Sequence, residues 1–453
     1  MTTGPNPRPP QRLRLDTGAP VTLGPMLGKP AGEGTIYEVA SHPGWVAKIF
    51  HPTLSDLQTK LGKVSAMTQS APPGVTQPNG FVVLTWPLHT IAGERGPVGY
   101  VMPRINTATA VEIHTMSNPS DRLNPPPTVP QWIKSTKWGH LLNVAANLCL
   151  AVEVVHRVNA VIGDFQERNI LVANTTEVTL VDCDSMQFTD RSGRRFLCGV
   201  GRPEFTAPEL SGQDLRTVPR EKPSDLFALA VHIHLLLMAG NHPFMRGIWT
   251  GEGEQPDALT LAKTGHWAGG PSSLLQTHPL APSVGFLPTD IQELFRRAFT
   301  VGVHDPRARP TAAEWRHALS GIRLTSCPRM MHEIPAGCAV CPWCAIEDER
   351  QARRLRSGST GPHRVRPAGT GSVPTRPATT GRVPTTGRVP TKQHDNPFGV
   401  STNVLIGAIA AVVLIVVALT IFIVWALLSG ATTFGALPAS ELLRWSIHRD
   451  RIW

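Results

Sequence analysis

Acidic residues are almost absent from residues 350–400, where Asp395 stands alone against nine arginines and Lys392. This stretch accounts for a net charge of +9, while the whole chain carries +10. The rest of the chain is therefore nearly balanced, and its charge does not indicate a nucleic-acid partner. An apolar run is also absent from residues 1–20, so we expect a disordered N-terminus there and no signal peptide.

A disulfide framework is not indicated, because Cys149, Cys183 and Cys198 are scattered along the chain. The remaining four of the seven cysteines fall in residues 327–344. Two short pairs there offer the ligand types that tetrahedral zinc prefers, namely Cys327 with His332 and Cys341 with Cys344. Cys338 is an alternate ligand.

Two redox interpretations of this cysteine cluster are disfavoured. A thioredoxin-like Cys-x-x-Cys needs a βαβ setting, which this segment lacks. A ferredoxin-type run needs a further cysteine where Asp348 stands. We therefore expect structural Zn²⁺, with reduced, unligated thiols as the alternative.

Residues 161–184 carry two carboxylates and an amide at an informative spacing, with Asp164, Asn169 and Asp182 separated by an apolar run. Phosphoryl transfer explains such a set. One carboxylate orients the attacking hydroxyl, while an Asn and a second Asp hold Mg²⁺ on the ATP phosphates.

A pair of glycines lies upstream, followed by a lysine on the second strand of an expected hairpin. Gly32 and Gly34 have no Cβ, so backbone N–H groups can approach phosphates closely. Lys48 would then reach the α- and β-phosphates. Tyr37 occupies the usual place of a third glycine.

Together with three downstream motifs, these residues resemble the eukaryotic-type protein kinases over about residues 22–322. The downstream motifs are Ala207-Pro208-Glu209, Ser224-Asp225 before an apolar helix, and the late arginine Arg309. The resemblance implies an α+β, two-lobed protein-kinase-like fold. It also implies that Asp225 holds the catalytic-loop backbone and that Arg309 pairs with Glu209.

The resemblance assigns catalytic roles to Asp164 and Lys48, and ATP and Mg²⁺ (or Mn²⁺) as cofactors. The residues expected to bind ATP are Gly32, Gly34, Val39, Ala47, Lys48 and Met102. The residues expected to hold the divalent cation are Asn169 and Asp182.

Several positions depart from the kinase pattern. Gly163 replaces an arginine that usually receives an activation-loop phosphate, so phosphorylation at Ser185, Thr189 or Ser192 should not be required for activity. Gln166 replaces a lysine and supplies no charge to the transferring phosphoryl group. Asp184 is either a further metal ligand or a solvated side chain. Residues 53–67 contain no Glu to pair with Lys48, and that role stays unassigned.

These departures resemble an atypical bacterial kinase-like group with a Gly-Asp catalytic loop, an Asp-x-Asp segment and a Cys-Pro-Trp-Cys cluster. Members of that group often occur beside von Willebrand A-type and metal-dependent phosphatase-type proteins in stress-response systems, which makes such proteins candidate partners. The chain has no Gly-hydrophobic-Gly hairpin signature, so we expect no nucleic-acid partner.

The C-terminal part is expected to anchor the chain. Residues 349–401 form a basic Pro/Thr/Gly/Arg-rich linker that cannot bury a core and should be extended. Residues 402–428 hold a long apolar run without charge, which predicts one transmembrane helix. The positive-inside preference places the kinase in the cytoplasm and residues 429–453 as a short tail outside the inner membrane.

The sequence thus predicts a disordered segment 1–20, a protein-kinase-like domain 21–322 and a zinc-binding module 323–348. The N-lobe should cover about 21–105 and the C-lobe about 128–322. The predicted function is that of a membrane-anchored, atypical bacterial serine/threonine kinase acting on unidentified protein substrates. The alternative is a pseudokinase that serves as an ATP-binding scaffold.

Overall fold

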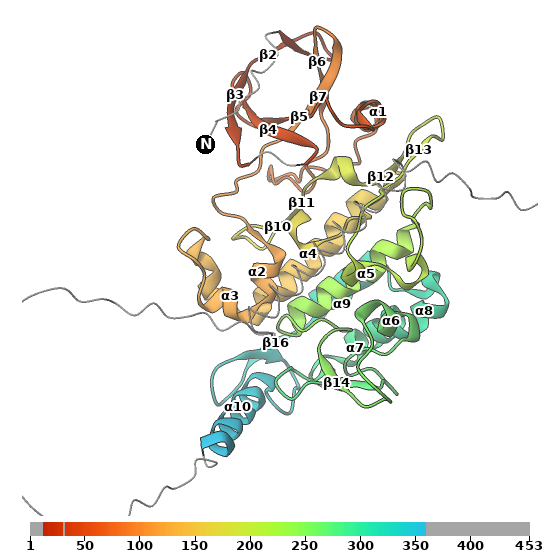
Figure 1. The fold of residues 1–453 in the computed structure, drawn as a ribbon. Coiled ribbons are helices and arrows are strands. Elements are labelled where there is room, and N and C mark those ends of the chain that lie inside the picture. Colours follow the sequence, from red (N-terminus) through yellow and green to blue (C-terminus); the bar gives the residue numbers. More distant parts are fainter. Residues whose placement is uncertain (1–11, 30–31, 359–453) are drawn as a thin grey trace, which may run out of the picture. The chain divides into compact units, whose positions relative to one another are not determined.

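The N-terminal lobe is a curled, antiparallel sheet with helix α1 (Leu57–Thr68) packed against it (Figure 1). The structure is a computed structural model that describes residues 12–29 and 32–358. The seven strands, in spatial order, are β2 (Pro20–Val21), β1 (Leu13–Leu15), β6 (His89–Gly93), β7 (Gly96–Pro103), β5 (Trp45–Phe50), β4 (Gly34–Val39) and β3 (Leu23–Leu27). A mixed fold with a curled sheet of this kind fits a kinase-like lobe.

The two faces of this sheet bury different cores. One face, formed by residues such as Ala47, Ile91 and Val101, packs with β1 and β2. The opposite face carries Phe50 and Tyr100, which pack with apolar residues of α1. Because successive side chains alternate between faces, one-residue steps along β5 decide which core a side chain enters.

The expectation of a disordered segment 1–20 is wrong for its second half. Leu13 and Leu15 are buried, while Arg14 between them is exposed. This alternation suits a strand with one face on a core, and β1 pairs with both β2 and β6. Residues 1–11 lie outside the described part of the chain.

The C-terminal lobe is built around three helices, the apolar α4 (Trp138–His156) and α5 (Lys222–Leu237) and the amphipathic α9 (Ala312–Gly321) (Figure 1). Helix α5 is buried on almost all sides, which explains its nearly continuous apolar sequence. Within the described residues, α4 is long and apolar enough to cross a membrane, but 61% of its most apolar window is buried inside the protein. It therefore has the environment of a core helix. The predicted span 402–428 lies outside the described residues.

The remaining elements of this lobe are short. Its helices are α2 (Ile113–Ser117), α3 (Pro119–Leu123), α6 (Ala258–Thr264), α7 (Thr289–Arg296) and α8 (Gly302–His304), joined by 3-10 turns and a π segment at Arg297–Val301. Its strands are β8 (Val111–Glu112), β9 (Ala160–Val161), β10 (Ile170–Val172), β11 (Val178–Leu180), β12 (Gln187–Thr189), β13 (Arg195–Phe196), β14 (Gly247–Trp249) and β15 (Leu275–Thr277). The strands β9 to β12 frame the two loops that carry the predicted catalytic residues.

The expected pairing of Arg309 with Glu209 is confirmed. Both terminal nitrogens of Arg309 donate to the Glu209 carboxylate at 2.7 Å. The same guanidinium also donates to the carbonyls of Pro223 and Gly302 at 2.8 Å, and the residue is 1% exposed. One planar fork of donors thus ties the Ala-Pro-Glu segment to the start of α5 and to α8.

A small module follows the C-lobe and docks on it. It contains β16 (Leu324–Ser326), β17 (Glu333–Pro335) and α10 (Pro342–Gly358). Glu333 accepts a hydrogen bond at 2.9 Å from the backbone N–H of Gly139, in the first turn of α4. A carboxylate at a helix N-terminus satisfies an otherwise unpaired donor and complements the helix dipole.

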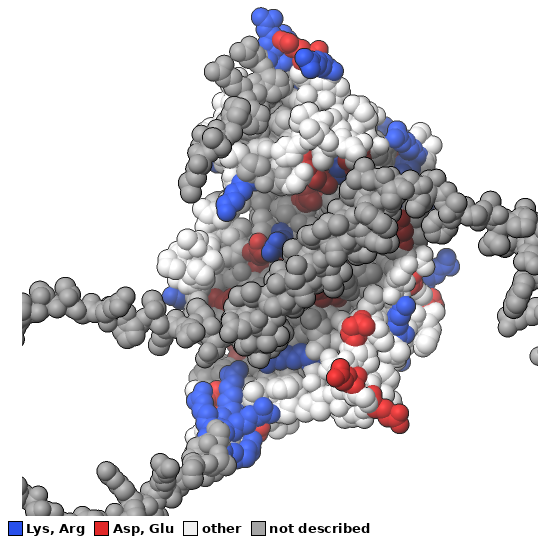
Figure 2. All heavy atoms as spheres, in the orientation of Figure 1, with Lys and Arg blue, Asp and Glu red and all other residues white. Residues whose placement is uncertain are grey.

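Helix α10 continues past the boundary that we expected at residue 348, so residues 349–358 belong to the module and not to the extended linker. Ion pairs one turn apart, Glu349 with Arg353 and Glu347 with Arg350, fit a helix better than an extended chain. The basic side chains at this end of the molecule are plain in Figure 2. Acidic residues of the same helix neutralise part of their charge.

Candidate functional site

The core of the site is a lysine held by two carboxylates. Lys48 on β5 donates to Asp184 at 2.7 and 2.9 Å and to Asp182 at 2.9 Å. Burial alone would lower the pKa of Lys48, but Asp184 and Asp182 outweigh burial and raise it above its usual value. The lysine therefore carries a fixed positive charge across the junction of the two lobes.

Asp184 is the partner of Lys48 that the sequence left unassigned. Tyr100 lies directly opposite Lys48 in the β5–β7 pairing, and its hydroxyl donates to Asp184 at 2.7 Å. Burial would raise the pKa of Asp184, but Lys48 holds it below its usual value. Of the two roles we considered for Asp184, the solvated one is wrong, because the residue is 5% exposed.

The catalytic loop holds Asp164 through two neutral amides. The Gln166 side chain donates to Asp164 Oδ2 at 2.7 Å. Asn169 donates to the Asp164 carbonyl at 2.9 Å and to Oδ2 at 3.2 Å. Gln166 therefore orients the carboxylate, and one of its two amide N–H donors is used in doing so.

Three of the predicted residues line one small hollow between the loop of Asp164 and the segment that begins at Val181: Asp164, Asn169 and Asp182. Since the amide nitrogen of Asn169 is bonded to Asp164, its amide oxygen is the atom left for a cation. Asp182 adopts a left-handed conformation with φ 58° and ψ 40°, which is uncommon outside glycine. Carboxylate and amide oxygens suit Mg²⁺ or Mn²⁺, so the donor set fits the expected metal.

Asp225 supports the catalytic loop from below, as the resemblance implied. Its carboxylate accepts from the backbone N–H of Ile162 at 2.7 Å and of Gly163 at 3.0 Å. The ring of His156, the last residue of α4, lies 2.9 Å from the same carboxylate. The backbone leading into Asp164 is thereby anchored to α4 and α5.

The strand register corrects two of the residues expected to bind ATP. Lys48 pairs with Ile36 and Tyr100, and cross-strand partners share a face. Ala47 is one residue from Lys48 and lies on the opposite face, where it packs in the same core as Val39. Neither can line a site that Lys48 faces.

Ile36, Val46 and Met102 are among the apolar residues on the Lys48 face, so Met102 lies on the side that its expected role requires. Gly34 lies so close to β5 that an added Cβ would sit 2.5 Å from the Ile49 carbonyl oxygen. Strand packing therefore requires that glycine, whatever binds nearby. Gly32 faces open space, with no atom within 4 Å of an added Cβ.

The Cys/His cluster forms a second site, distant in sequence from the first. One ligand atom from each of Cys327, His332, Cys341 and Cys344 lies within 4.8 Å of the others. The Sγ atoms of Cys327 and Cys344 are 3.7 Å apart. The His332 Nδ1 lies 3.5 Å from Cys341 Sγ and 3.6 Å from Cys344 Sγ.

These separations suit tetrahedral zinc. With Zn–S bonds of about 2.3 Å, two sulfurs of a tetrahedron lie about 3.8 Å apart. The sulfurs are too far apart for disulfides, and all seven cysteines are free. The backbone N–H of Met330 lowers the pKa of Cys327 to about 6, which favours the thiolate that zinc binds. Cys338 is excluded from the set, since its Sγ faces the Val340 carbonyl at 3.1 Å.

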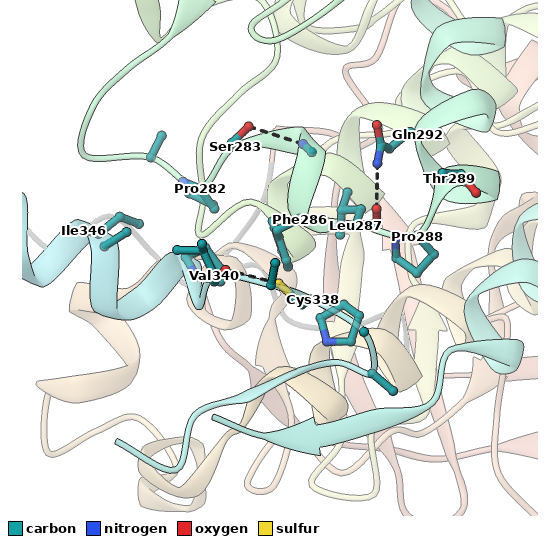
Figure 3. Close-up of a pocket in the computed structure, with 18 of the residues that line it drawn as sticks. Pro282, Ser283, Phe286, Leu287, Pro288, Thr289, Gln292, Cys338, Val340 and Ile346 are labelled. Atoms are coloured by element: carbon teal, nitrogen blue, oxygen red, sulfur yellow. Dashed lines mark hydrogen bonds between the residues drawn. The ribbon is translucent and has the colours of Figure 1, made fainter. Parts of the chain in front are cut away.

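A separate groove of about 730 Å³ lies between residues 279–292 and the module segment 335–346 (Figure 3). Its walls are mostly apolar. The Ser283 hydroxyl accepts a hydrogen bond from the backbone N–H of Gly285, and the Gln292 amide donates one to the carbonyl of Leu287. It contains none of the catalytic or metal-binding residues described above. The groove is therefore a feature of the module junction.

No protein-family model matches the chain. The chain is similar to the protein kinase YegI of Escherichia coli (strain K12), with 32% identity over 355 residues, covering 75% of this chain and 50% of that protein. YegI of Escherichia coli O157:H7 gives 32% over 357 residues, covering 74% and 50%. The serine/threonine-protein kinase PknD of Chlamydia pneumoniae gives 29% over 169 residues, covering 33% and 17%.

The chain thus spans about half the length of the two Escherichia relatives it matches. The similarities support a protein-kinase-like family for this chain.

Helix α1 carries a lysine, and no acidic residue, on the face that it turns toward Lys48 and Asp184. Lys63 is on the buried face of α1 and is 6% exposed. Burial lowers its pKa to about 8, although Cys198 and Asp184 oppose the shift. Its neighbour Lys60 instead reaches Glu33 in the glycine-rich loop at 2.8 Å. The sequence of residues 53–67 shows both lysines, but it does not show which way each side chain points.

Lys63→Met should stabilise the folded protein at pH 7 by about 1–3 kcal/mol, because it removes a buried cation. Lys63 loses its proton near pH 8 when folded and near 10.5 when unfolded. The stability of the wild type should therefore rise between these pH values, and the advantage of the variant should shrink there. Urea unfolding of the full chain across pH 7–10 measures this.

The matched control is Lys60→Met, which removes an ion-paired lysine from the same helix. We expect no gain in stability from it. A gain from Lys63→Met that stays constant from pH 7 to 10 would show that packing, not charge, is responsible.

Proposed function

We propose that this chain is a membrane-anchored, atypical bacterial protein kinase that transfers the ATP γ-phosphate to serine or threonine hydroxyls. One arrangement carries the proposal: Lys48, Asp164, Asn169 and Asp182 converge on the junction of the lobes. Similarity to proteins named protein kinases supports the same class.

In this proposal Asp164 accepts the proton of the substrate hydroxyl as that oxygen attacks the phosphorus. Gln166 and Asn169 keep its carboxylate at a fixed angle. Mg²⁺ or Mn²⁺, held by Asn169 and Asp182, would neutralise charge on the phosphates. Lys48 would stay bonded to Asp184 and turn the N–H donor that it gives to Asp182 toward the α- and β-phosphates.

A second candidate is a pseudokinase that binds ATP and serves as a scaffold. The observation that favours it is Gln166, which supplies no charge and is bonded to Asp164. A kinase lysine in that position would stabilise the transferring phosphoryl group. The two candidates differ in chemistry and not in nucleotide binding.

The decisive comparison is phosphoryl transfer by the wild type and by Asp164→Ala. The full chain in detergent, given γ-labelled ATP with Mg²⁺ or Mn²⁺, should label itself or an added protein. Asp164→Ala should abolish the label and retain ATP binding, because Asp164 acts on the hydroxyl. Equal label from both proteins would contradict the kinase and leave the scaffold.

Asp184→Asn should weaken ATP binding about tenfold or more, because Lys48 loses its buried ionic partner. Calorimetric titration with Mg–ATP measures this. Tyr100→Phe should have a smaller effect, since it removes one of the hydrogen bonds to Asp184. Glu94→Gln, in the exposed turn between β6 and β7, is the control and should bind normally. Unchanged affinity in Asp184→Asn would refute this role.

We also propose that Cys327, His332, Cys341 and Cys344 hold one structural zinc ion. Elemental analysis should find one zinc per chain, and Cys341→Ser should lose it and lower the melting temperature, with ATP affinity near normal. A structural site contributes on the order of 10 kcal/mol to a small module. Cys338→Ser is the matched control and should keep its zinc, because Cys338 lies outside the set. A metal-free wild type of full stability, or one that contains iron, would contradict the assignment.

The membrane anchor 402–428, the linker beyond residue 358 and the outer tail 429–453 complete the proposal, and all three lie outside the described residues. Charge supports the orientation, since the linker is basic and lies on the kinase side of the apolar run. Von Willebrand A-type and metal-dependent phosphatase-type proteins are the proposed partners.

A further inference from the structure

A buried arginine joins the catalytic loop to two parts of the segment that follows Asp184. Arg220 precedes α5 and is 4% exposed. Its two terminal nitrogens donate to different carbonyls, Nη1 to Gly163 and Nη2 to Val200. Gly163 is the residue before Asp164, and Val200 lies in the segment that leads to Ala207 of the Ala-Pro-Glu motif.

The backbone of Arg220 is held as firmly as its side chain. Its N–H donates to the Gln187 side-chain oxygen at 2.8 Å, and the Gln187 amide donates to the Arg220 carbonyl at 2.6 Å. Gln187 lies on β12, three residues after Asp184. Arg220 therefore contacts three segments of the chain, at Gly163, Gln187 and Val200. These segments must be aligned for a substrate hydroxyl to reach Asp164.

Two glycines make room for the guanidinium. Gly163 has φ +73°, and an added Cβ there would lie 2.9 Å from Cys198 and 3.2 Å from Arg220 Nη1. A Cβ on Gly201 would lie 2.9 Å from Nη2. The glycine at position 163, which removes an arginine from the catalytic loop, is thus also what admits Arg220 from outside the loop.

The charge of Arg220 is directed at carbonyl oxygens. Within residues 12–29 and 32–358, no carboxylate lies at ion-pair distance from it. An arginine stays charged when buried, and its planar fork can bridge two acceptors at a fixed separation. Such a bridge needs no phosphate on the segment it holds.

We propose that Arg220 is a positioning residue that fixes residues 186–206 against the catalytic loop independently of phosphorylation. This inference rests on the proposed kinase function. In this proposal Arg220 holds the segment in place. In kinases that have the loop arginine, that arginine and a phosphorylated side chain would do so together. Phosphorylation of Thr189 or Ser192 is then unnecessary for the arrangement around Asp164.

Hydrogen exchange of residues 186–206 in the full chain tests the bridge directly. Arg220→Ala should raise exchange there about tenfold or more, since hydrogen bonds from charged donors are worth at least that factor each. Arg220→Lys, which keeps one charged donor group, should restore part of the protection. Gln213→Ala is the control: it removes an exposed side chain from the loop that leads to Arg220 and should leave exchange unchanged.

Kinetics separate positioning from general destabilisation. Arg220→Ala should lower kcat about tenfold or more while leaving KM for ATP within about twofold, because Lys48 and Asp184 are untouched. Gly201→Ala places a methyl against Nη2 without altering the arginine and should show the same pattern if Arg220→Ala fails to fold. Phosphatase treatment of the wild type should change neither exchange nor kcat.

Wild-type exchange in Arg220→Ala and Gly201→Ala, or a loss of protection in the phosphatase-treated wild type, would overturn the proposal. If the wild type transfers no phosphate at all, the kinase function fails, whereas hydrogen exchange still decides whether Arg220 holds the segment. The two failures are therefore distinguishable.

Discussion

The structure depends on one buried ionic contact, between Lys48 of the sheet lobe and the carboxylates of Asp182 and Asp184 in the helical lobe. Removing charges from water is costly, and a buried pair repays that cost only when its remaining donors and acceptors are satisfied. Here Tyr100 fills a further acceptor position on Asp184. A lysine, two carboxylates and a hydroxyl thus form a cluster that fixes how β5 and the Asp-x-Asp turn meet.

This contact explains how helix α1 can lack an acid. The carboxylate that a kinase helix would offer to Lys48 comes from Asp184, two residues after Asp182. Helix α1 is then free to carry Lys63 toward the site and Lys60 toward Glu33 of the glycine-rich loop. The position of α1 is therefore set by its apolar face on Phe50 and Tyr100 and not by the lysine of β5.

The sequence predicted the residues whose spacing is dictated by chemistry, and the structure shows why others escaped. Asp164, Asn169 and Asp182 line one hollow, and the four residues of the Cys/His cluster meet, because the members of each set lie close together in the sequence. Ala47 was wrongly expected to bind ATP, although the alternation of side chains along a strand is enough to put it on the other face from Lys48. Asp184 could not be assigned, because its partner lies 136 residues away and is brought to it by tertiary folding. Tyr100 was missed for the same reason.

Helix α4 links the proposed zinc module to the catalytic loop by direct contacts at both of its ends. Glu333 of the module bonds the first turn of α4, and His156 at its last residue meets Asp225, which holds the backbone before Asp164. Nineteen residues of helix span about 28 Å, so a rigid rod joins the two sites. These contacts show that the module and the catalytic loop are anchored to the same helix. They do not show that one site signals to the other, because such coupling requires an element with two arrangements. The module therefore holds the N-terminal end of α4. Loss of the module should lower the stability of the fold before it affects phosphoryl transfer.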